Sequence, residues 1–349
     1  MKKHIALAAM AATLLLSGNA MSKEELPKTH VQVVGYLSNV PAYLQFEKPF
    51  WTETIPKLSD GRVTADIKSF DEMGLKGPEI LRLMSNGVIQ FGTATLSYFA
   101  SDNPINEAVD LAGMAPSVKT ERMIVDTFKP VYERRLLKQG IKLLGISTNA
   151  AQVIFCNSPI QGLAGLKGKK VRTSSRTQAD FVEALGGSSV NMAFAEVVPA
   201  LQTKVLDCAI TGSLSGFTAK WYEVSNHLLK LPINWNPILY AVNLNDWNKI
   251  DPKVRTFIQT NMNKMIDSIW DDAARQTQEG YDCNTGAAAC KAKVKGKMTL
   301  VVPTQADEKL LEKLTKDDVV PKWAKRCSAD CVADFNETIG KKLDIVASK

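Results

Sequence analysis

The residue with the clearest potential for chemistry is Arg172, which ends a short strand pattern and is followed by serines. A guanidinium is permanently charged and offers two parallel donors to a carboxylate. Ser174 or Ser175 can cap a following helix, whose first N–H groups also favour a negative charge. The pattern predicts capture of a carboxylate, with a plain surface ion pair of Arg172 as the alternative.

Recognised catalytic motifs are missing from the sequence. It contains no nucleophile elbow, zinc-protease helix, P-loop or dinucleotide-binding glycine pattern. Beyond residue 20 only His30 and His227 remain, and we interpret both as surface or core residues, with His227 in the tail of a helix. We therefore predict a protein without enzymatic activity or a cofactor. An exported enzyme that uses Asp207 or Glu196 is the alternative.

The six cysteines indicate structural disulfides in an exported chain. A metal site would need ligand pairs with nearby histidines, which this sequence lacks, so no metal is predicted. Six cysteines allow 15 pairings, and we expect the local pairs Cys283–Cys290 and Cys327–Cys331. We expect the remaining pair, Cys156–Cys208, to join two strands.

Residues 1–20 have the pattern of a secretory signal peptide, with a basic start, an apolar stretch and small residues before the expected cleavage after Ala20. We expect a periplasmic product that is not inserted in the membrane. Without Lys2 and Lys3 the formal charge falls from +7 to +5. We interpret the basic residues as scattered, so nucleic-acid binding is not predicted.

Strand and helix patterns alternate along most of the chain, which is typical of an α/β fold. The expected strands are 31–34, 63–67, 88–93, 142–146, 152–155 and 170–172, and the expected helices are 43–58, 78–84, 122–139, one ending at Leu185, one over 197–205, and 252–281. Two strands separated by only a few residues, at 142–146 and 152–155, predict a crossing from one lobe to another. The longest helix, starting at Asp251-Pro252, is predicted to brace both lobes.

Several motifs together resemble the solute-binding proteins of tripartite ATP-independent periplasmic (TRAP) transporters. They are Leu166-Lys167-Gly168-Lys169-Lys170-Val171-Arg172, Ala184-Leu185-Gly186-Gly187, Met192-Ala193-Phe194-Ala195-Glu196-Val197 and Ala200-Leu201-Gln202-Thr203-Lys204-Val205-Leu206-Asp207. Weaker matches extend the resemblance over most of residues 30 to 275.

The resemblance implies a two-lobed periplasmic-binding-protein fold of type II character, joined by hinge strands and the long helix. It assigns residues 28–149 and about 238–275 to lobe 1, and 150–237 and about 276–349 to lobe 2. It places Arg172 on the substrate carboxylate and Phe194 near the ligand, with a core role as the alternative for Phe194. It implies membrane permease subunits as partners.

Departures from the family pattern bear on the ligand. Gln152 stands where sialic-acid binders have a second arginine, and Thr211 stands where they have an asparagine. Trp235 resembles an aromatic that lines the pocket of 2-oxoacid binders, with a packed hinge residue as its alternative. Together with Ser175, these residues predict a site for an aromatic or branched monocarboxylate or a 2-oxoacid. A C4-dicarboxylate receptor and a ligand-presenting sensor remain open.

Overall fold

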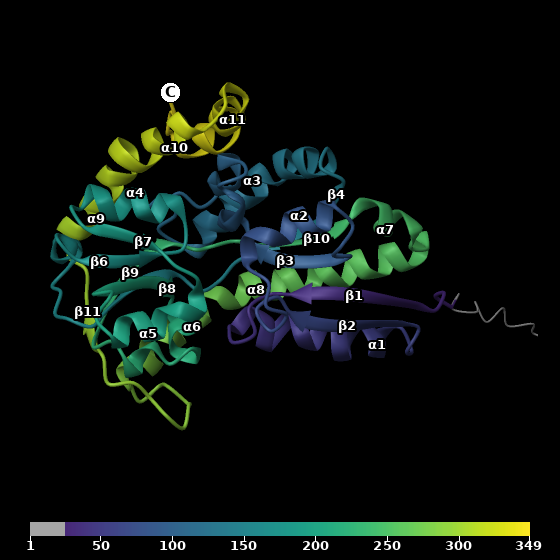
Figure 1. Cartoon of the computed structure of the whole chain (residues 1–349), viewed down its shortest axis with the longest axis horizontal. Coiled ribbons are helices and arrows are strands. Elements are labelled where there is room, and N and C mark those ends of the chain that lie inside the picture. The colour runs from purple at the N-terminus through teal and green to yellow at the C-terminus, as the bar shows by residue number, and fades with distance from the viewer. Residues whose placement is uncertain (1–24) are drawn as a thin grey trace, which may run out of the picture.

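The computed structural model describes residues 25–349, which form two β-sheets flanked by helices (Figure 1). The predicted signal peptide and its cleavage site lie outside these residues. The α/β class and the two-lobed arrangement predicted from the sequence are confirmed.

The first sheet has five strands in the order β2-β1-β3-β10-β4. β1 runs parallel to β2 and β3, whereas β10 is antiparallel to β3 and β4. Strand β10 is therefore a late segment inserted into a sheet built from the start of the chain. The strands are β1 (Thr29–Gly35), β2 (Val63–Ser69), β3 (Phe91–Thr95), β4 (Ile141–Ser147) and β10 (Ile238–Asn243).

The second sheet has six strands in the order β11-β9-β5-β8-β6-β7. β5 is antiparallel to both β8 and β9, while β6 is parallel to β7 and β8. The strands are β5 (Gln152–Cys156), β6 (Lys170–Thr173), β7 (Ser188–Asn191), β8 (Cys208–Gly212), β9 (His227–Asn234) and β11 (Thr299–Val301).

The chain crosses between the sheets twice through very short segments. Residues 148–151 join β4 to β5, and residues 235–237 join β9 to β10. The first crossing is the one that the sequence predicts. Both segments are short, so they connect the two sheets directly.

Helices cover the faces of both sheets (Figure 1). Continuous helical turns over Ala42–Glu47 and Phe50–Thr54 lead into the first helix. The helices are α1 (Ile55–Leu58), α2 (Ile80–Ser85), α3 (Val118–Leu137), α4 (Arg176–Ala184), α5 (Val197–Gln202), α6 (Ser213–Thr218), α7 (Leu244–Lys249), α8 (Pro252–Thr285), α9 (Gln305–Leu314), α10 (Val320–Arg326), α11 (Ala329–Phe335) and α12 (Lys341–Leu343).

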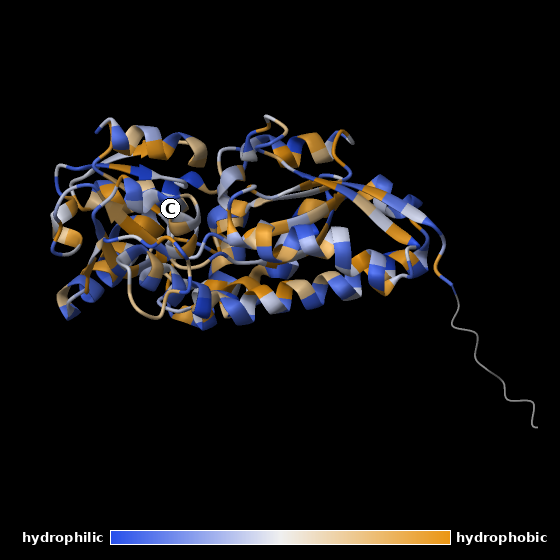
Figure 2. Cartoon of the chain, turned by 90° about the horizontal axis from the view of Figure 1, so that it is seen from below, coloured by the Kyte–Doolittle hydropathy of each residue, from blue (hydrophilic) through white to orange (hydrophobic). Residues whose placement is uncertain are grey.

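The 34-residue helix α8 connects the two lobes as predicted. Its N-cap Asp251 accepts a hydrogen bond from the backbone N–H of Lys253 at 2.8 Å, and Gly286 ends it with φ +79. α8 packs on β4 and α3 of the first lobe and on α6, β9 and β11 of the second. Both hydrophobic and hydrophilic residues line α8 (Figure 2), and its buried face includes Ile258, Met262 and Trp270.

Three local predictions are wrong. The third strand begins at Phe91 rather than Val88, because Gly87 turns the chain with φ +74 and Val88 is left 71% exposed. α5 ends at Gln202, because Lys204 adopts φ +59, and Val205 is exposed. His227 starts strand β9 instead of ending a helix.

The C-terminal helices contact both lobes. Asp307 of α9 accepts a hydrogen bond from the backbone N–H of Leu163 at 2.8 Å, on the side of the second sheet. Asp334 of α11 forms an ion pair with Arg135 of α3 at 2.6 Å, on the side of the first sheet. Among residues 25–349, no helix has the length and apolar character that a membrane crossing requires.

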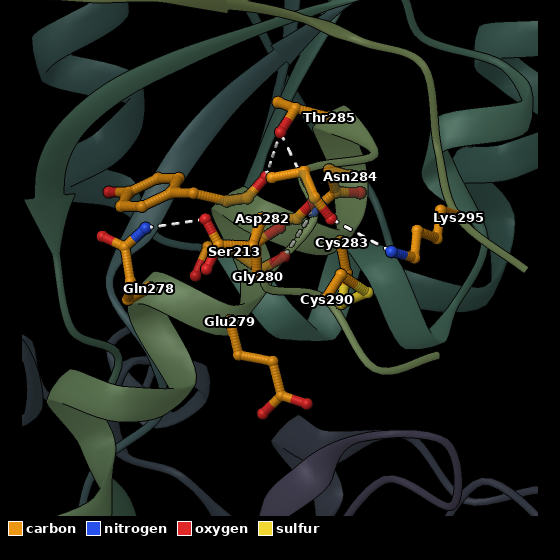
Figure 3. The surroundings of a disulfide bond; sticks show 12 residues. Ser213, Gln278, Glu279, Gly280, Asp282, Cys283, Asn284, Thr285, Cys290 and Lys295 are labelled. Carbon is orange, nitrogen blue, oxygen red and sulfur yellow. Dashed lines mark hydrogen bonds between the residues drawn. A yellow bond between two sulfur atoms is a disulfide. The ribbon is translucent and has the colours of Figure 1, made fainter. Parts of the chain in front are cut away.

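The three expected disulfides are confirmed. Cys156 and Cys208 lie opposite each other on the antiparallel strands β5 and β8. Cys283 near the end of α8 pairs with Cys290 (Figure 3), and Cys327–Cys331 joins the end of α10 to α11.

Candidate binding site

A small cavity of about 20 Å³ lies where residues of both lobes and of both crossings meet. Its volume holds roughly one water molecule, so a larger ligand requires the lobes to separate. The lining residues are Tyr36, Leu37, Val40, Tyr98, Asn149, Gln152, Arg172, Ser174, Phe194, Thr211, Ser215 and Asn236.

Arg172 is the single charged residue in this lining. It is 2% exposed, and its Nε and Nη1 donate hydrogen bonds to the carbonyls of Met192 (3.0 Å) and Ile210 (2.8 Å). It forms no ion pair with any residue in the described part of the chain. Burial lowers the pKa of Arg172 to about 10, which still leaves it cationic at neutral pH.

Two phenols of the first lobe, Tyr36 and Tyr98, line the cavity together with Arg172. Burial raises the pKa of each phenol above its usual value. Tyr36 shares a 2.7 Å hydrogen bond with the Thr95 hydroxyl. At neutral pH these phenols are neutral, so they offer hydroxyl groups and no compensating charge.

Two asparagines in the crossings complete the polar wall. Asn149 Nδ2 donates to the carbonyl of Asn236 at 2.8 Å, so the two crossings are hydrogen-bonded to each other. Asn236 Oδ1 accepts from the Ser97 hydroxyl at 3.2 Å. Because both asparagines lie on the segments that join the lobes, a ligand that contacts them would contact the hinge directly.

Of the residues predicted for this site, the structure brings four to the cavity: Arg172, Phe194, Thr211 and Gln152. Phe194 stacks on Trp221 with ring centroids 5.4 Å apart. Gln152 donates through Nε2 to the carbonyl of Ala150 at 3.2 Å. Gln152 and Thr211 are supplied by the adjacent strands β5 and β8.

Ser175 and Trp235 are not part of the cavity lining, although their chain neighbours Ser174 and Asn236 are. The Ser175 hydroxyl accepts from the backbone N–H of Gln178 at 3.2 Å and caps α4. The Trp235 indole N–H donates to the carbonyl of Ala115 at 2.9 Å, and its ring is buried. Each side chain is thus engaged elsewhere in the fold.

Sequence reasoning missed Tyr36, Tyr98, Asn149 and Asn236, which belong to no motif. The position of the two asparagines inside the lobe crossings was the available signal, since a crossing passes beside the interlobe space. No comparable signal marks Tyr36 and Tyr98, because they come from separate segments of the first lobe.

Solved structures of known proteins share this architecture. An extracytoplasmic solute receptor of Bordetella pertussis with pyroglutamic acid superposes with a TM-score of 0.78, at 22% identity, covering 88% of this chain and 98% of that one. A TRAP solute-binding protein of Desulfovibrio salexigens with bound orotic acid gives 0.77 at 15% identity, covering 88% and 97%.

Two bacterial proteins are also similar to this chain in sequence. The sialic acid-binding periplasmic protein of Vibrio cholerae is 24% identical over 219 residues, 62% of this chain and 68% of that protein. An uncharacterized protein of Haemophilus influenzae is 22% identical over 278 residues, 78% and 82% of the two chains.

Two α/β lobes, joined by paired crossings around a cavity with one buried cation, define the class of extracytoplasmic solute-binding receptors. A model of the bacterial extracellular solute-binding protein family 7 matches residues 38–315. This chain belongs to that family, the receptors of TRAP transporters. The predicted kinship is confirmed, and the partners of such a receptor are a small organic acid and a membrane permease.

Proposed function

We propose that this receptor reversibly captures a small organic monocarboxylate in the cavity around Arg172. The observation that carries the proposal is a buried guanidinium without an ion pair among the described residues. Burying an unpaired charge is costly, and a carboxylate held by charge-assisted hydrogen bonds would offset that cost. The site is thus electrostatically suited to an anion.

A single negative charge on the ligand fits the rest of the lining. Apart from Arg172 the cavity offers amides, hydroxyls and apolar side chains. A second carboxylate would lose its hydration without gaining a cation. Receptors of similar fold have been solved with pyroglutamic acid and orotic acid, which combine one carboxylate with neutral ring amides. Asn149, Gln152 and Asn236 could serve such amides.

Capture without turnover is the second part of the proposal. Asp207 and Glu196, the carboxylates considered for an enzyme, do not line the cavity. Asp207 accepts from the backbone N–H of Lys170 at 2.8 Å, and Glu196 is exposed.

We also propose export to the periplasm with cleavage after Ala20.

The proposed lobes follow sheet membership. Lobe 1 comprises 28–149 and about 238–275, and lobe 2 comprises 150–237 and residues from about 276. The C-terminal helices, assigned to lobe 2 from the sequence, bind both lobes through Asp307 and Asp334 and so would act as a tie across the hinge.

Isothermal titration of refolded protein against pyroglutamate, succinate and L-gulonate tests the proposal. We expect binding of a monocarboxylate and an affinity loss of about 100-fold in Arg172→Ala, since a charged hydrogen-bonding partner contributes about 1.5–3 kcal/mol. Arg172→Lys should retain part of the affinity, because it keeps the charge but not the planar fork. Arg82→Ala, at an exposed site on α2, is the control.

Unchanged affinity in a folded Arg172→Ala protein would refute the role of Arg172.

A C4-dicarboxylate ligand is the second candidate, because a dicarboxylate-binding protein of Rhodobacter capsulatus is 30% identical over 134 residues, 38% of this chain and 40% of that protein. Tight binding of succinate with no monocarboxylate bound would favour it.

A further inference from the structure

The loop of residues 286–298, between α8 and β11, is strongly basic. It contains Lys291, Lys293, Lys295 and Lys297 at every second position and no acidic residue. Residues 1–24 hold three lysines and one glutamate, so the described part of the chain carries +5 of the total +7. The loop alone supplies four of these charges. The loop contains no aromatic residue, so it is not the kind of basic patch with interleaved aromatics that nucleic-acid binding would favour.

The base of this lysine loop is held firmly against α8 (Figure 3). The Cys283–Cys290 disulfide closes its first half. The backbone N–H of Gly296 donates to the carbonyl of Cys283 at 2.8 Å, and that of Met298 donates to the carbonyl of Asn284 at 3.0 Å. An added Cβ at Gly296 would overlap the Asn284 carbonyl, so this return requires glycine.

The outer part of the lysine loop faces solvent. Lys291, Lys293 and Lys297 are exposed, and Val294 between them is 64% exposed. Lys295 is drawn inward, donating to the carbonyl of Ala287 at 3.1 Å. In Figure 1 the loop projects from lobe 2 on the side opposite α10 and α11.

The charges of the lysine loop are not neutralised within the protein. None of its four lysines forms an ion pair with a residue in 25–349. The nearest acids along the chain are engaged on α8: Glu279 pairs with Arg275, and Asp282 accepts from Gln278 Nε2 at 2.9 Å. The lysine loop is thus an exposed positive projection whose charges have no acidic partner among the described residues.

We propose that the lysine loop binds the anionic lipid surface of the membrane. Protein interfaces favour aromatic residues and arginine at their centre and disfavour lysine. The loop has neither arginine nor an aromatic residue. Lysines bind anionic lipid headgroups without needing a specific geometry, and the exposed Val294 can enter the headgroup boundary. The loop would hold the receptor near the membrane whatever ligand it carries.

Co-sedimentation of the mature protein with vesicles tests this proposal. We expect binding to phosphatidylcholine vesicles with about 30% phosphatidylglycerol at low salt, release at about 0.5 M salt, and no binding to pure phosphatidylcholine. The triple variant Lys291→Gln, Lys293→Gln, Lys297→Gln should bind about 100-fold more weakly. Each lysine near such a surface contributes a similar share of the binding free energy, and the variant loses three of them.

The control removes the same charge from exposed lysines of lobe 1, in Lys48→Gln, Lys57→Gln, Lys68→Gln. It should bind vesicles almost as the unmodified protein does. Equal losses in the two triple variants would overturn the proposal, since net charge alone would then explain binding. So would unchanged vesicle binding in the loop variant together with impaired uptake in a reconstituted transporter, which would point to an acidic protein surface instead.

Discussion

The Glu107 carboxylate accepts a hydrogen bond at 2.8 Å from the backbone N–H of Arg176, the first residue of helix α4. It also accepts one at 3.2 Å from Thr177. Glu107 precedes α3 of the first lobe, whereas α4 follows the strand that carries Arg172. The first lobe thus supplies a carboxyl acceptor to the helix N-terminus next to the candidate ligand-binding arginine, and burial raises the pKa of this carboxyl to about 7.

Replacing Glu107 with alanine should destabilise the protein by about 2–3 kcal/mol, because the part-buried N–H of Arg176 and the buried N–H of Thr177 lose their acceptor. Arg326, whose Nη2 lies 3.6 Å from Glu107 Oε2, would also lose a partner. Glu107→Gln keeps one acceptor and should cost less. Urea unfolding measures both. A loss below about 0.5 kcal/mol in the alanine variant would mean that water replaces the carboxylate.

We expect Glu47 to make the free energy of unfolding depend on pH. It is fully buried, accepts from the backbone N–H of Tyr36 (2.8 Å) and the Thr93 hydroxyl (2.5 Å), and burial raises its pKa to about 7. The folded state therefore holds the proton more tightly than the unfolded state. This contribution is complete below about pH 4.5 and is lost as pH rises towards 7.

The melting temperature of the unmodified protein should accordingly fall between pH 5 and pH 8. The fall should be smaller in the Glu47→Gln variant. Glutamine is neutral at every pH and can accept from Tyr36 while donating to Thr93. Asp110, whose pKa burial also raises to about 7, should keep part of the dependence in this variant. Parallel profiles for the two proteins would show that Glu47 does not contribute.

Gly280 permits close packing of α8 on α6. A Cβ at this position would overlap the backbone of Ser213 and Leu214. Alanine inside a helix normally stabilises by up to about 1 kcal/mol, but this backbone overlap cannot be relieved by a side-chain rotation. We expect Gly280→Ala to destabilise by about 1–3 kcal/mol, and differential scanning calorimetry gives the sign. A higher melting temperature would contradict this expectation, because it would mean that α6 shifts and relieves the overlap without loss of stability.

The Cys156–Cys208 disulfide closes a loop of 52 residues that includes Arg172. Its loss in Cys156→Ala, Cys208→Ala should cost about 2–4 kcal/mol through greater freedom of the unfolded chain. The Cys327–Cys331 disulfide, with a separation of four residues, should contribute less. Chemical denaturation of the two double variants compares them; an equal loss would contradict the loop-length argument.

Local features of the sequence determined much of this protein. Composition and spacing predicted the Asp251-Pro252 start of α8, a serine cap for α4 at Ser174 or Ser175, and the pairing of cysteines close in sequence, because these features are short-range. Arg172 at a strand end next to a helix start is equally local. The α/β alternation likewise follows from the periods of apolar residues.

Only the tertiary structure decided which side chains meet at the cavity. Tyr36 and Tyr98 of the first lobe line one cavity with Arg172 of the second, and no spacing in the chain encodes that arrangement. Ser174 lines the cavity, whereas the hydroxyl of its neighbour Ser175 caps α4. Asn236 lines the cavity, whereas the indole of its neighbour Trp235 donates to the carbonyl of Ala115, 120 residues away in the chain. The side chain of each pair that enters the cavity is thus decided by the folded backbone and not by residue type.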